Sequence, residues 1–388
     1  MFNTQPPHLY FGGVERRILE TAKLLEGDID MTIYSGTKAG FKQQFDIDGT
    51  RIVPCHSTDY VFPLDNWVFN RTIAKMVNDI DVDVFEAHAA SGDGFLRMLR
   101  KCKRTTPFIQ TVHGVLADEY LIAKQTGGLS FRETVANLFM RQLSKVEEHA
   151  TRLADLVVTV SNYSKKRIVD LYGADETKIR VVPNGVDPEK FKPFDSEQFK
   201  RSIGLQDKNV VLFVGRLIPR KGLTYLVEAA RKVTEEMPNT IFVIVGNGPL
   251  RHQIVSTLEK LHLAGNFRFF GDVSDEMLPN FYGLADVFVL PSIQEGQGIA
   301  LLEAQASTKP VVAFNVSGVT EAVLDEKSGF LVDRANSEML CEAIMKLLAD
   351  KTLREHMGSA GRDFVRRNFT WDICAQKMLT IYREASGM

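Results

Sequence analysis

The sequence is poor in cysteine. Its 388 residues include four cysteines, and none of them forms a C-x-x-C pair or stands at zinc-binding spacing from a histidine. Scattered thiols of this kind are typical of proteins from a reducing compartment, and they argue against a disulfide framework and a structural zinc site. The four are Cys55, Cys102, Cys341 and Cys374.

Long apolar runs and an excess of basic charge are absent too. No apolar stretch approaches the roughly 18 residues of a membrane-spanning helix, and residues 1–17 lack the apolar core of a signal peptide. The 47 Lys and Arg residues are balanced by 49 Asp and Glu residues, which is not the charge of a nucleic-acid-binding protein. We therefore expect a cytoplasmic protein with no nucleic-acid partner, and a peripheral contact with the inner face of the membrane stays open.

Two local charge patterns are weak signals. Residues 95–107 concentrate basic side chains that could meet anionic headgroups, but a solvated basic helix end is the favoured interpretation. Asp81-Val82-Asp83 has the spacing of a metal–diphosphate motif, yet it precedes a predicted strand and would lie at the wrong end of a sheet for a ligand. The same spacing recurs at 28–30 and 46–48, and we predict no metal site.

Short apolar segments alternate with helical patterns along the chain. This alternation indicates βαβ units and a parallel sheet, and it occurs twice, so we predict an α/β protein with two Rossmann-like, doubly wound domains facing a cleft. The predicted strands are 31–35, 51–54, 83–88, 107–113 and 156–161 in the first series, and 209–215, 240–246, 267–271, 287–290, 310–314 and 329–332 in the second.

The domain boundaries follow from turn-rich composition. VVPNGVDPEKFKP (181–193) ends the first series, so we assign the first domain to residues 1–190 and the second to 205–365. The tail, 366–388, has the spacing of an amphipathic helix and is expected to pack back on the first domain. Upstream of the helix predicted from Val14, only Met1 to Thr4 remain to form a first strand.

The most informative stretch is DVFVLPSIQEGQGIALLEAQA (286–306). A buried strand, a loop with Gly296 and Gly298, and a helix from Ile299 make a ready phosphate site, because the first N–H groups of a helix are unpaired and carry the positive end of its dipole. Glu303 follows among apolar neighbours, where an unpaired carboxylate would cost several kcal/mol, so vicinal sugar hydroxyls are candidate partners. The alternative is that Glu295 is a loop charge and Glu303 a surface residue.

Three further positions carry candidate chemistry. Arg216 and Lys221 flank the loop after a predicted strand, where they could hold a diphosphate without a metal. His113 falls at the carboxyl end of another strand, although an uninvolved loop histidine is an equal alternative. Gly12-Gly13 precedes a helix and could cradle an anion, but most such pairs are turns.

These motifs resemble a known family, the retaining, GT-B fold, nucleotide-sugar glycosyltransferases that include bacterial mannosyltransferases and sucrose synthases. The resemblance spans nearly the whole chain. It rests on GGVER (12–16), TVHG (111–114), VPNGVD (182–187), VGRLIPRKG (214–222), VGNGPL (245–250) and EGQGIALLEA (295–304).

The resemblance implies a role for each candidate. Arg216 and Lys221 would bind the donor diphosphate, and Glu303 the ribose hydroxyls. The donor sugar would be held by Glu295, Gly296, Gln297, Gly298 and Ile299, with His113 reaching it from the first domain and Gly13 near the transferred group. His113, Glu295, Arg216 and Lys221 would then be the catalytic set, and Gln297 stands where the family usually has an aromatic residue.

The expected activity is therefore metal-independent, retaining transfer of a hexose-type sugar from a nucleotide-diphosphate donor to a hydroxyl of a glycan, a lipid-linked sugar or a small molecule. The first domain would serve the acceptor and the second the nucleotide sugar, and no cofactor is expected. Two rival interpretations remain: a GT-B nucleotide-sugar epimerase, and a catalytically idle nucleotide-sugar-binding subunit.

Overall fold

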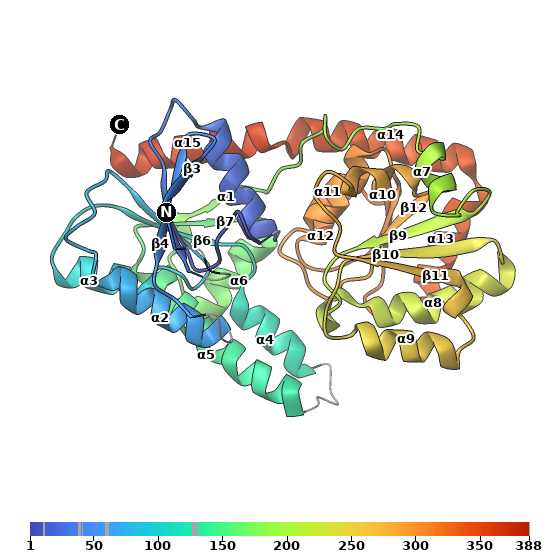
Figure 1. The fold of residues 1–388 in the computed structure, drawn as a ribbon, viewed down its shortest axis with the longest axis horizontal. Coiled ribbons are helices and arrows are strands. Elements are labelled where there is room, and N and C mark those ends of the chain that lie inside the picture. Colours follow the sequence, from blue (N-terminus) through green and yellow to red (C-terminus); the bar gives the residue numbers. More distant parts are fainter. Residues whose placement is uncertain (11, 38–39, 41, 59–61, 126–130, 388) are drawn as a thin grey trace. The chain divides into compact units, whose positions relative to one another are not determined.

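The computed structural model describes residues 1–10, 12–37, 40, 42–58, 62–125 and 131–387. The chain divides into two compact units, each built on one sheet with helices packed against it (Figure 1). Unit 1 comprises Met1–Asn184 and Trp371–Met388, and unit 2 comprises Gly185–Thr370. Among the described residues, each helix is too short or too polar to cross a bilayer.

Unit 1 contains an eight-stranded sheet in the order β3-β4-β2-β1-β5-β6-β7-β8. Its strands are β1 (Phe2–Asn3), β2 (Thr32–Gly36), β3 (Phe45–Ile47), β4 (Thr50–Cys55), β5 (Phe85–His88), β6 (Phe108–Val112), β7 (Leu156–Thr159) and β8 (Ile179–Val181). Its helices are α1 (Gly13–Leu24), α2 (Phe62–Ala74), α3 (Asp93–Lys101), α4 (Leu116–Gln125), α5 (Phe131–Leu153), α6 (Asn162–Tyr172) and α15 (Trp371–Ser386).

The first strand of unit 1 is a stub at the middle of the sheet. β1 has two residues, and it pairs in parallel with β2 on one side and with β5 on the other. Phe2 is fully buried and its ring packs on Phe85 and Phe95, so this short segment still supplies core apolar area. β1 therefore takes a place inside the sheet, between β2 and β5.

Unit 2 contains a six-stranded, wholly parallel sheet in the order β11-β10-β9-β12-β13-β14. Its strands are β9 (Asn209–Val214), β10 (Thr240–Val245), β11 (Phe267–Gly271), β12 (Val287–Leu290), β13 (Val311–Phe314) and β14 (Gly329–Val332). Its helices are α7 (Glu197–Ser202), α8 (Leu223–Glu236), α9 (Arg251–Lys260), α10 (Leu278–Leu284), α11 (Ile299–Ala306), α12 (Val319–Ala322), α13 (Ser337–Ala349) and α14 (Lys351–Asn368).

The central strands of both sheets are buried on both faces. Every residue of β10, β12 and β13 is buried, as expected where helices cover both sides of a parallel sheet and the strand sequence is a continuous apolar run. The predicted class, two Rossmann-like, doubly wound α/β domains, is confirmed.

The last helix, α15, belongs to unit 1, although unit 2 separates it in the sequence from the rest of unit 1. α15 packs against α1, and Leu25, Ala375 and Leu379 form a small apolar cluster at their contact. The side chain of Arg17 on α1, which is 1% exposed, also reaches Met378 Sδ at 3.4 Å.

Candidate functional site

The polar loops of unit 2 gather where the strand order of its sheet reverses. β10 and β11 lie on one side of β9, while β12, the next strand in the chain, lies on the other side. At such a reversal the loops that follow the two central strands diverge to opposite faces and leave a crevice for ligands at their carboxyl ends. The loop after β9 carries Arg216 to Lys221, and the loop after β12 carries Ser292 to Gly298.

These two loops contact each other directly. The N–H of Ile293 donates to the carbonyl oxygen of Arg220 at 2.9 Å. Gly222 has a φ of +66°, and a Cβ built on it would lie 1.8 Å from the carbonyl oxygen of Pro291. A side chain at this position would both strain the backbone and push the loops apart, so glycine is required by the close approach.

Glu295 is the centre of the contact. It is 5% exposed, and its Oε1 accepts hydrogen bonds from the ammonium of Lys221 and from Ser292 Oγ, the latter at 2.7 Å. Arg220 Nη1 lies 3.5 Å from Oε2. Burial alone raises the pKa of the Glu295 carboxyl, but Lys221 and Arg220 outweigh burial and hold this pKa below its usual value. Glu295 is therefore an ionised, oriented group.

The helix that follows offers its N-terminus to the same crevice. Gly298 precedes α11 with a φ of +92°, and no side chain of the described residues caps the helix. The first N–H groups of α11 thus point toward the loop that holds Glu295 and the buried Gln297. A phosphate is a natural partner for such a terminus, because the helix contributes about half a positive charge there.

Glu303 lies inside unit 2, one turn into α11. It is 3% exposed, and its Oε2 accepts a hydrogen bond from the hydroxyl of Tyr282 at 2.6 Å. The Tyr282 ring is fixed by edge-on packing against Phe191 and by contact with Phe288. The hydroxyl therefore holds the carboxylate in one orientation.

The balance of charge around the crevice is positive. Arg220 and Lys221 carry two positive charges against the single negative charge of Glu295. Arg216, which is exposed and follows the end of β9, adds a third positive charge. With the helix terminus and the carboxylate of Glu303 both counted, the crevice has a net charge of roughly +1 to +2, which suits a diphosphate. The described residues hold no group of three or more His, Cys, Asp or Glu side chains placed for a metal ion.

Unit 1 carries the two remaining predicted residues. His113 follows β6, and its Nε2 lies 2.9 Å from Nδ1 of His88 at the end of β5, with the two rings stacked. The pKa of His88 is lowered by burial and, to a smaller extent, by the positive charge of Arg17. The pKa of His113 is lowered by burial, by His88 and by Arg17. Both imidazoles are neutral at physiological pH.

Gly13 is the first residue of α1 and is exposed. The helix N-terminus already has a carboxylate in its first turn, because Glu15 is 5% exposed and its Oε2 lies 2.3 Å from the position that a Cβ on Gly12 would take. A negative group there occupies the favourable end of the dipole, so the Gly12-Gly13 turn is a poorer anion cradle than the terminus of α11.

Three arginines of 95–107 have partners within unit 1. Arg97 pairs with Asp93 at 2.8 Å and Arg100 with Asp155 at 2.5 Å. Arg104 donates to the carbonyl oxygen of Ile80 at 2.9 Å. Lys101 and Lys103, at and after the end of α3, are exposed, so the cluster agrees with the interpretation of a solvated basic helix end.

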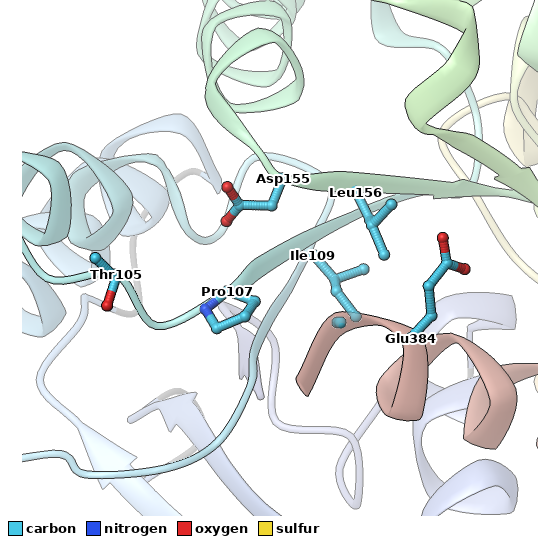
Figure 2. A pocket seen from close by; sticks show the side chains of 7 residues that line it. Thr105, Pro107, Ile109, Asp155, Leu156 and Glu384 are labelled. Carbon is cyan, nitrogen blue, oxygen red and sulfur yellow. The ribbon is translucent and has the colours of Figure 1, made fainter. Parts of the chain in front are cut away.

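A pocket of about 280 Å³ lies in unit 1, at the end of the sheet where β6 and β7 begin and opposite the end that carries His88 and His113 (Figure 2). Asp155 and Glu384 face it, and each is paired with an arginine, Arg100 and Arg180 respectively. None of the predicted site residues lines it. The lining residues are Thr105, Pro107, Ile109, Asp155, Leu156, Glu384 and Ala385.

Four residues that contact the predicted site residues were not among those predicted from the sequence: Arg220 and Ser292 at Glu295, Tyr282 at Glu303, and His88 at His113. Arg220 could have been suspected, because it precedes Lys221 in the same loop. Ser292 lies three residues before Glu295 in the same loop. The Tyr282–Glu303 contact joins two helices and the His88–His113 contact joins the ends of two strands, and no local pattern marks either of them.

Two family descriptions together match most of the chain. Residues 195–364 match "Glycosyl transferases group 1", and residues 11–190 match "Glycosyltransferase Family 4".

Curated relatives agree with those descriptions. An uncharacterized glycosyltransferase of Methanocaldococcus jannaschii is 31% identical over 287 residues, which are 73% of this chain and 70% of the relative. A GDP-mannose-dependent alpha-(1-6)-phosphatidylinositol monomannoside mannosyltransferase of Mycobacterium tuberculosis is 32% identical over 238 residues, which are 59% of this chain and 62% of that enzyme.

Solved structures show the same fold. Sucrose-phosphate synthase of Thermosynechococcus elongatus superposes with a TM-score of 0.82 at 21% identity, covering 96% of this chain and 93% of that protein. HepE of Anabaena, solved in complex with UDP and glucose, superposes with a TM-score of 0.75 at 20% identity, covering 97% of each chain. At these identities the likeness concerns the fold alone, which is GT-B.

Proposed function

The chain belongs to the group 1 family of glycosyltransferases, and from this premise we propose that it transfers a hexose-type sugar from a nucleotide-diphosphate donor to an acceptor hydroxyl, with retention of configuration and without a metal ion. The observation that carries the proposal is the crevice of unit 2, where cations, a helix N-terminus and two oriented carboxylates meet at the reversal between β9 and β12.

Each group has a chemical task in this proposal. Departure of the nucleotide leaves negative charge on its diphosphate, and Arg216, Lys221 and the N–H groups of α11 stabilise that charge as a metal ion would. Glu303 accepts hydrogen bonds from the ribose hydroxyls. The sugar lies against Glu295 and the turn of Gly296, Gln297, Gly298 and Ile299, with Gly13 and His113 of unit 1 also required for transfer.

The pairing of Lys221 with Glu295 refines these tasks. A lysine bound to a buried carboxylate is held in place before the donor arrives, and the diphosphate would meet a preorganised ammonium. Glu295 in turn keeps Oε2 beside Arg220, so the three side chains act as one rigid group. Substitution of any one of these side chains should therefore loosen the positions of the other two.

The first experiment is a donor screen. The full chain is incubated with UDP-glucose, GDP-mannose and other nucleotide sugars, together with a mixture of glycan, lipid-linked and small-molecule acceptors, and nucleotide release is measured. We expect release with at least one donor, dependent on an acceptor, and a product whose anomeric configuration by NMR matches that of the donor. An inverted product would refute retention, and binding of nucleotide sugars without turnover would identify an idle subunit.

Chelation tests metal independence. We expect full activity in EDTA, because Arg216, Lys221 and the α11 terminus supply the positive charge. Activity that disappears in EDTA and returns with magnesium would contradict this part of the proposal.

The proposed acceptor classes bear on location. For a lipid-linked acceptor we propose that the protein works in the cytoplasm with peripheral contact to the membrane. Cosedimentation with vesicles of anionic phospholipid tests that contact, and a fully unbound protein at low salt would exclude it.

A further inference from the structure

The loop between β12 and α11 of unit 2 contains a buried polar side chain that has no task in the proposed transfer (Figure 1). Gln294 stands directly before Glu295 and is 1% exposed. Its amide oxygen, Oε1, is buried and has no hydrogen-bond partner among the described residues. The amide nitrogen, Nε2, makes no hydrogen bond within the same part of the chain either.

The backbone holds this residue at the crevice. The carbonyl oxygen of Gln294 accepts a hydrogen bond from Arg220 Nη1 at 3.4 Å, and the N–H of Ile293 donates to the carbonyl oxygen of Arg220 at 2.9 Å. The same Arg220 Nη1 lies 3.5 Å from Glu295 Oε2. Gln294 is therefore fixed where the loop after β9 meets the loop after β12, and both loops belong to unit 2.

A buried amide without partners is unusual. Such a group loses its hydrogen bonds to water on folding and gains none in return, so nearly all buried polar groups in proteins are paired. Gln305 on α11 shows the ordinary arrangement. It is fully buried, and although its Oε1 is unpaired too, its Nε2 donates to the carbonyl oxygens of Leu301 at 3.1 Å and Ala322 at 2.8 Å. Gln294 lacks such contacts among the described residues, so its amide is a candidate group for binding a ligand.

The chemistry of the amide narrows the ligand group. A carboxamide can donate two hydrogen bonds and accept two, and it carries no charge. It cannot balance a phosphate as Arg216 or Lys221 can, whereas a neutral hydroxyl, which also donates and accepts, is a matching partner. A nucleotide sugar contains two sets of hydroxyls, and those of the ribose are assigned to Glu303. The hydroxyls of the sugar remain.

We propose that Gln294 is a specificity-determining residue that binds a hydroxyl of the donor sugar through its side-chain amide. This inference rests on the proposed function, because it takes the ligand of unit 2 to be a nucleotide sugar. In the free chain the unpaired amide lowers stability, and a sugar hydroxyl that pairs with it removes that cost. Gln294 thus reduces the stability of unit 2 and increases its affinity for the sugar part of the donor.

The test compares the unaltered chain with Gln294→Met, which keeps the length of the side chain and removes its polar atoms. Without ligand, hydrogen exchange in the buried strands β12 and β13 should slow about three- to tenfold in the variant. Isothermal titration calorimetry then uses UDP, GDP, UDP-glucose and GDP-mannose as probes. The variant should bind the free nucleotides as the unaltered chain does, and bind the nucleotide sugar about tenfold more weakly.

Gln305→Met is the matched control, because it removes a buried amide that has partners in the protein. It should speed hydrogen exchange in the same strands and leave the ratio of nucleotide-sugar affinity to nucleotide affinity unchanged. Gln294→Leu provides a second variant if Gln294→Met does not fold. Its side chain is also apolar, so it should show the same selective loss of affinity for the nucleotide sugar.

The outcomes separate this inference from the proposed function. Faster exchange in Gln294→Met would mean that the amide is already hydrogen-bonded in the free protein, and an unchanged affinity for the nucleotide sugar would remove the sugar contact even if the chain transfers sugar. An equal loss of affinity for the free nucleotide would assign the amide to the nucleotide instead. Slower exchange in a chain that binds none of the four probes would leave the unpaired amide intact and reject the sugar contact together with the proposed function.

Discussion

Glu303 is the site residue whose burial the sequence indicated best. Its apolar neighbours on α11 predicted a buried carboxylate, and it is 3% exposed. Glu303→Gln should lower the affinity for the free nucleotide by about 1.5–3 kcal/mol, because an amide cannot accept two hydroxyl hydrogen bonds as a carboxylate does. Isothermal titration calorimetry checks this, with Glu259→Gln on the exposed face of α9 as control. Equal affinities of the two variants would remove Glu303 from the ribose site.

Tyr282 tests whether the orientation of Glu303 matters. Tyr282→Phe keeps the ring packing against Phe191 and Phe288 but removes the 2.6 Å hydrogen bond. We expect nucleotide affinity to fall by about 0.5–1.5 kcal/mol, less than for Glu303→Gln, because the carboxylate remains but is no longer fixed. Tyr172→Phe in unit 1 should not change the affinity. A loss as large as that of Glu303→Gln would mean that the tyrosine itself contacts the nucleotide.

Side-chain pairings were harder to foresee than burial. Neither the Lys221–Glu295 ion pair nor the His88–His113 contact has a local sequence signal, because each depends on two loops that meet only when neighbouring strands pair. The sequence indicated the strands that end at these residues, and hence the edge of the sheet, but not which side chains touch there.

Among the elements, the two loops at the β9–β12 reversal depend on a glycine. Gly222→Ala should lower the free energy of unfolding of unit 2 by about 2–4 kcal/mol, since alanine in left-handed backbone costs about 1–2 kcal/mol and the overlap with Pro291 adds to it. Nucleotide affinity should fall as well. Hydrogen exchange resolved on unit 2 measures the first effect. Gly265→Ala, whose Cβ would meet nothing within 4 Å, should change stability by less than about 0.5 kcal/mol.

The longer, strongly patterned elements were predicted well from the sequence. The apolar runs at 240–246 and 310–314 became β10 (Thr240–Val245) and β13 (Val311–Phe314). β3 and β8 were missed, because three-residue edge strands have too little apolar periodicity. α14 was missed as well, since its exposed face is rich in charge and its contact with α11 relies on Gly358 and Gly361 rather than on large apolar residues.

At the scale of the whole molecule, stability should respond to pH through a single buried carboxyl of unit 1. Burial raises the pKa of Glu147 to about 8, against 4.5 in an unfolded chain, although Tyr172 and the N–H of Leu116 donate to it. A raised carboxyl pKa contributes stability that is fully present below the unfolded value and is lost as the pH rises through the folded value. Unit 1 should therefore lose unfolding free energy between about pH 4.5 and 8, at up to about 1.4 kcal/mol per pH unit.

Glu147→Gln mimics the protonated side chain and should flatten that loss. Urea titrations followed by tryptophan fluorescence suit the measurement, because both tryptophans, Trp67 and Trp371, belong to unit 1. His88 and His113 act with the opposite sign: their pKa values are lowered, so their contribution is present above 6.5 and is lost as the pH falls through their folded values. A Glu147→Gln variant with the same slope above pH 6.5 as the unaltered chain would assign the dependence to another group.

The return of α15 to unit 1 has a consequence for how the chain is made. Leu25 contacts Leu379, and Glu86 accepts a hydrogen bond from Tyr382. Because unit 2 lies between them in the sequence, all of unit 2 is synthesised before Leu379 and Tyr382 are available. At ordinary synthesis rates of about 5–20 residues per second, this interval is roughly 10–40 s. During that time unit 2 can complete its own sheet from one continuous stretch, while unit 1 exposes the apolar surface of α1 that α15 later covers, and Glu86 has its Thr111 donor but lacks the Tyr382 hydroxyl. The nascent first unit is thus a natural client for chaperones, and the unit begun last is the first that can finish folding.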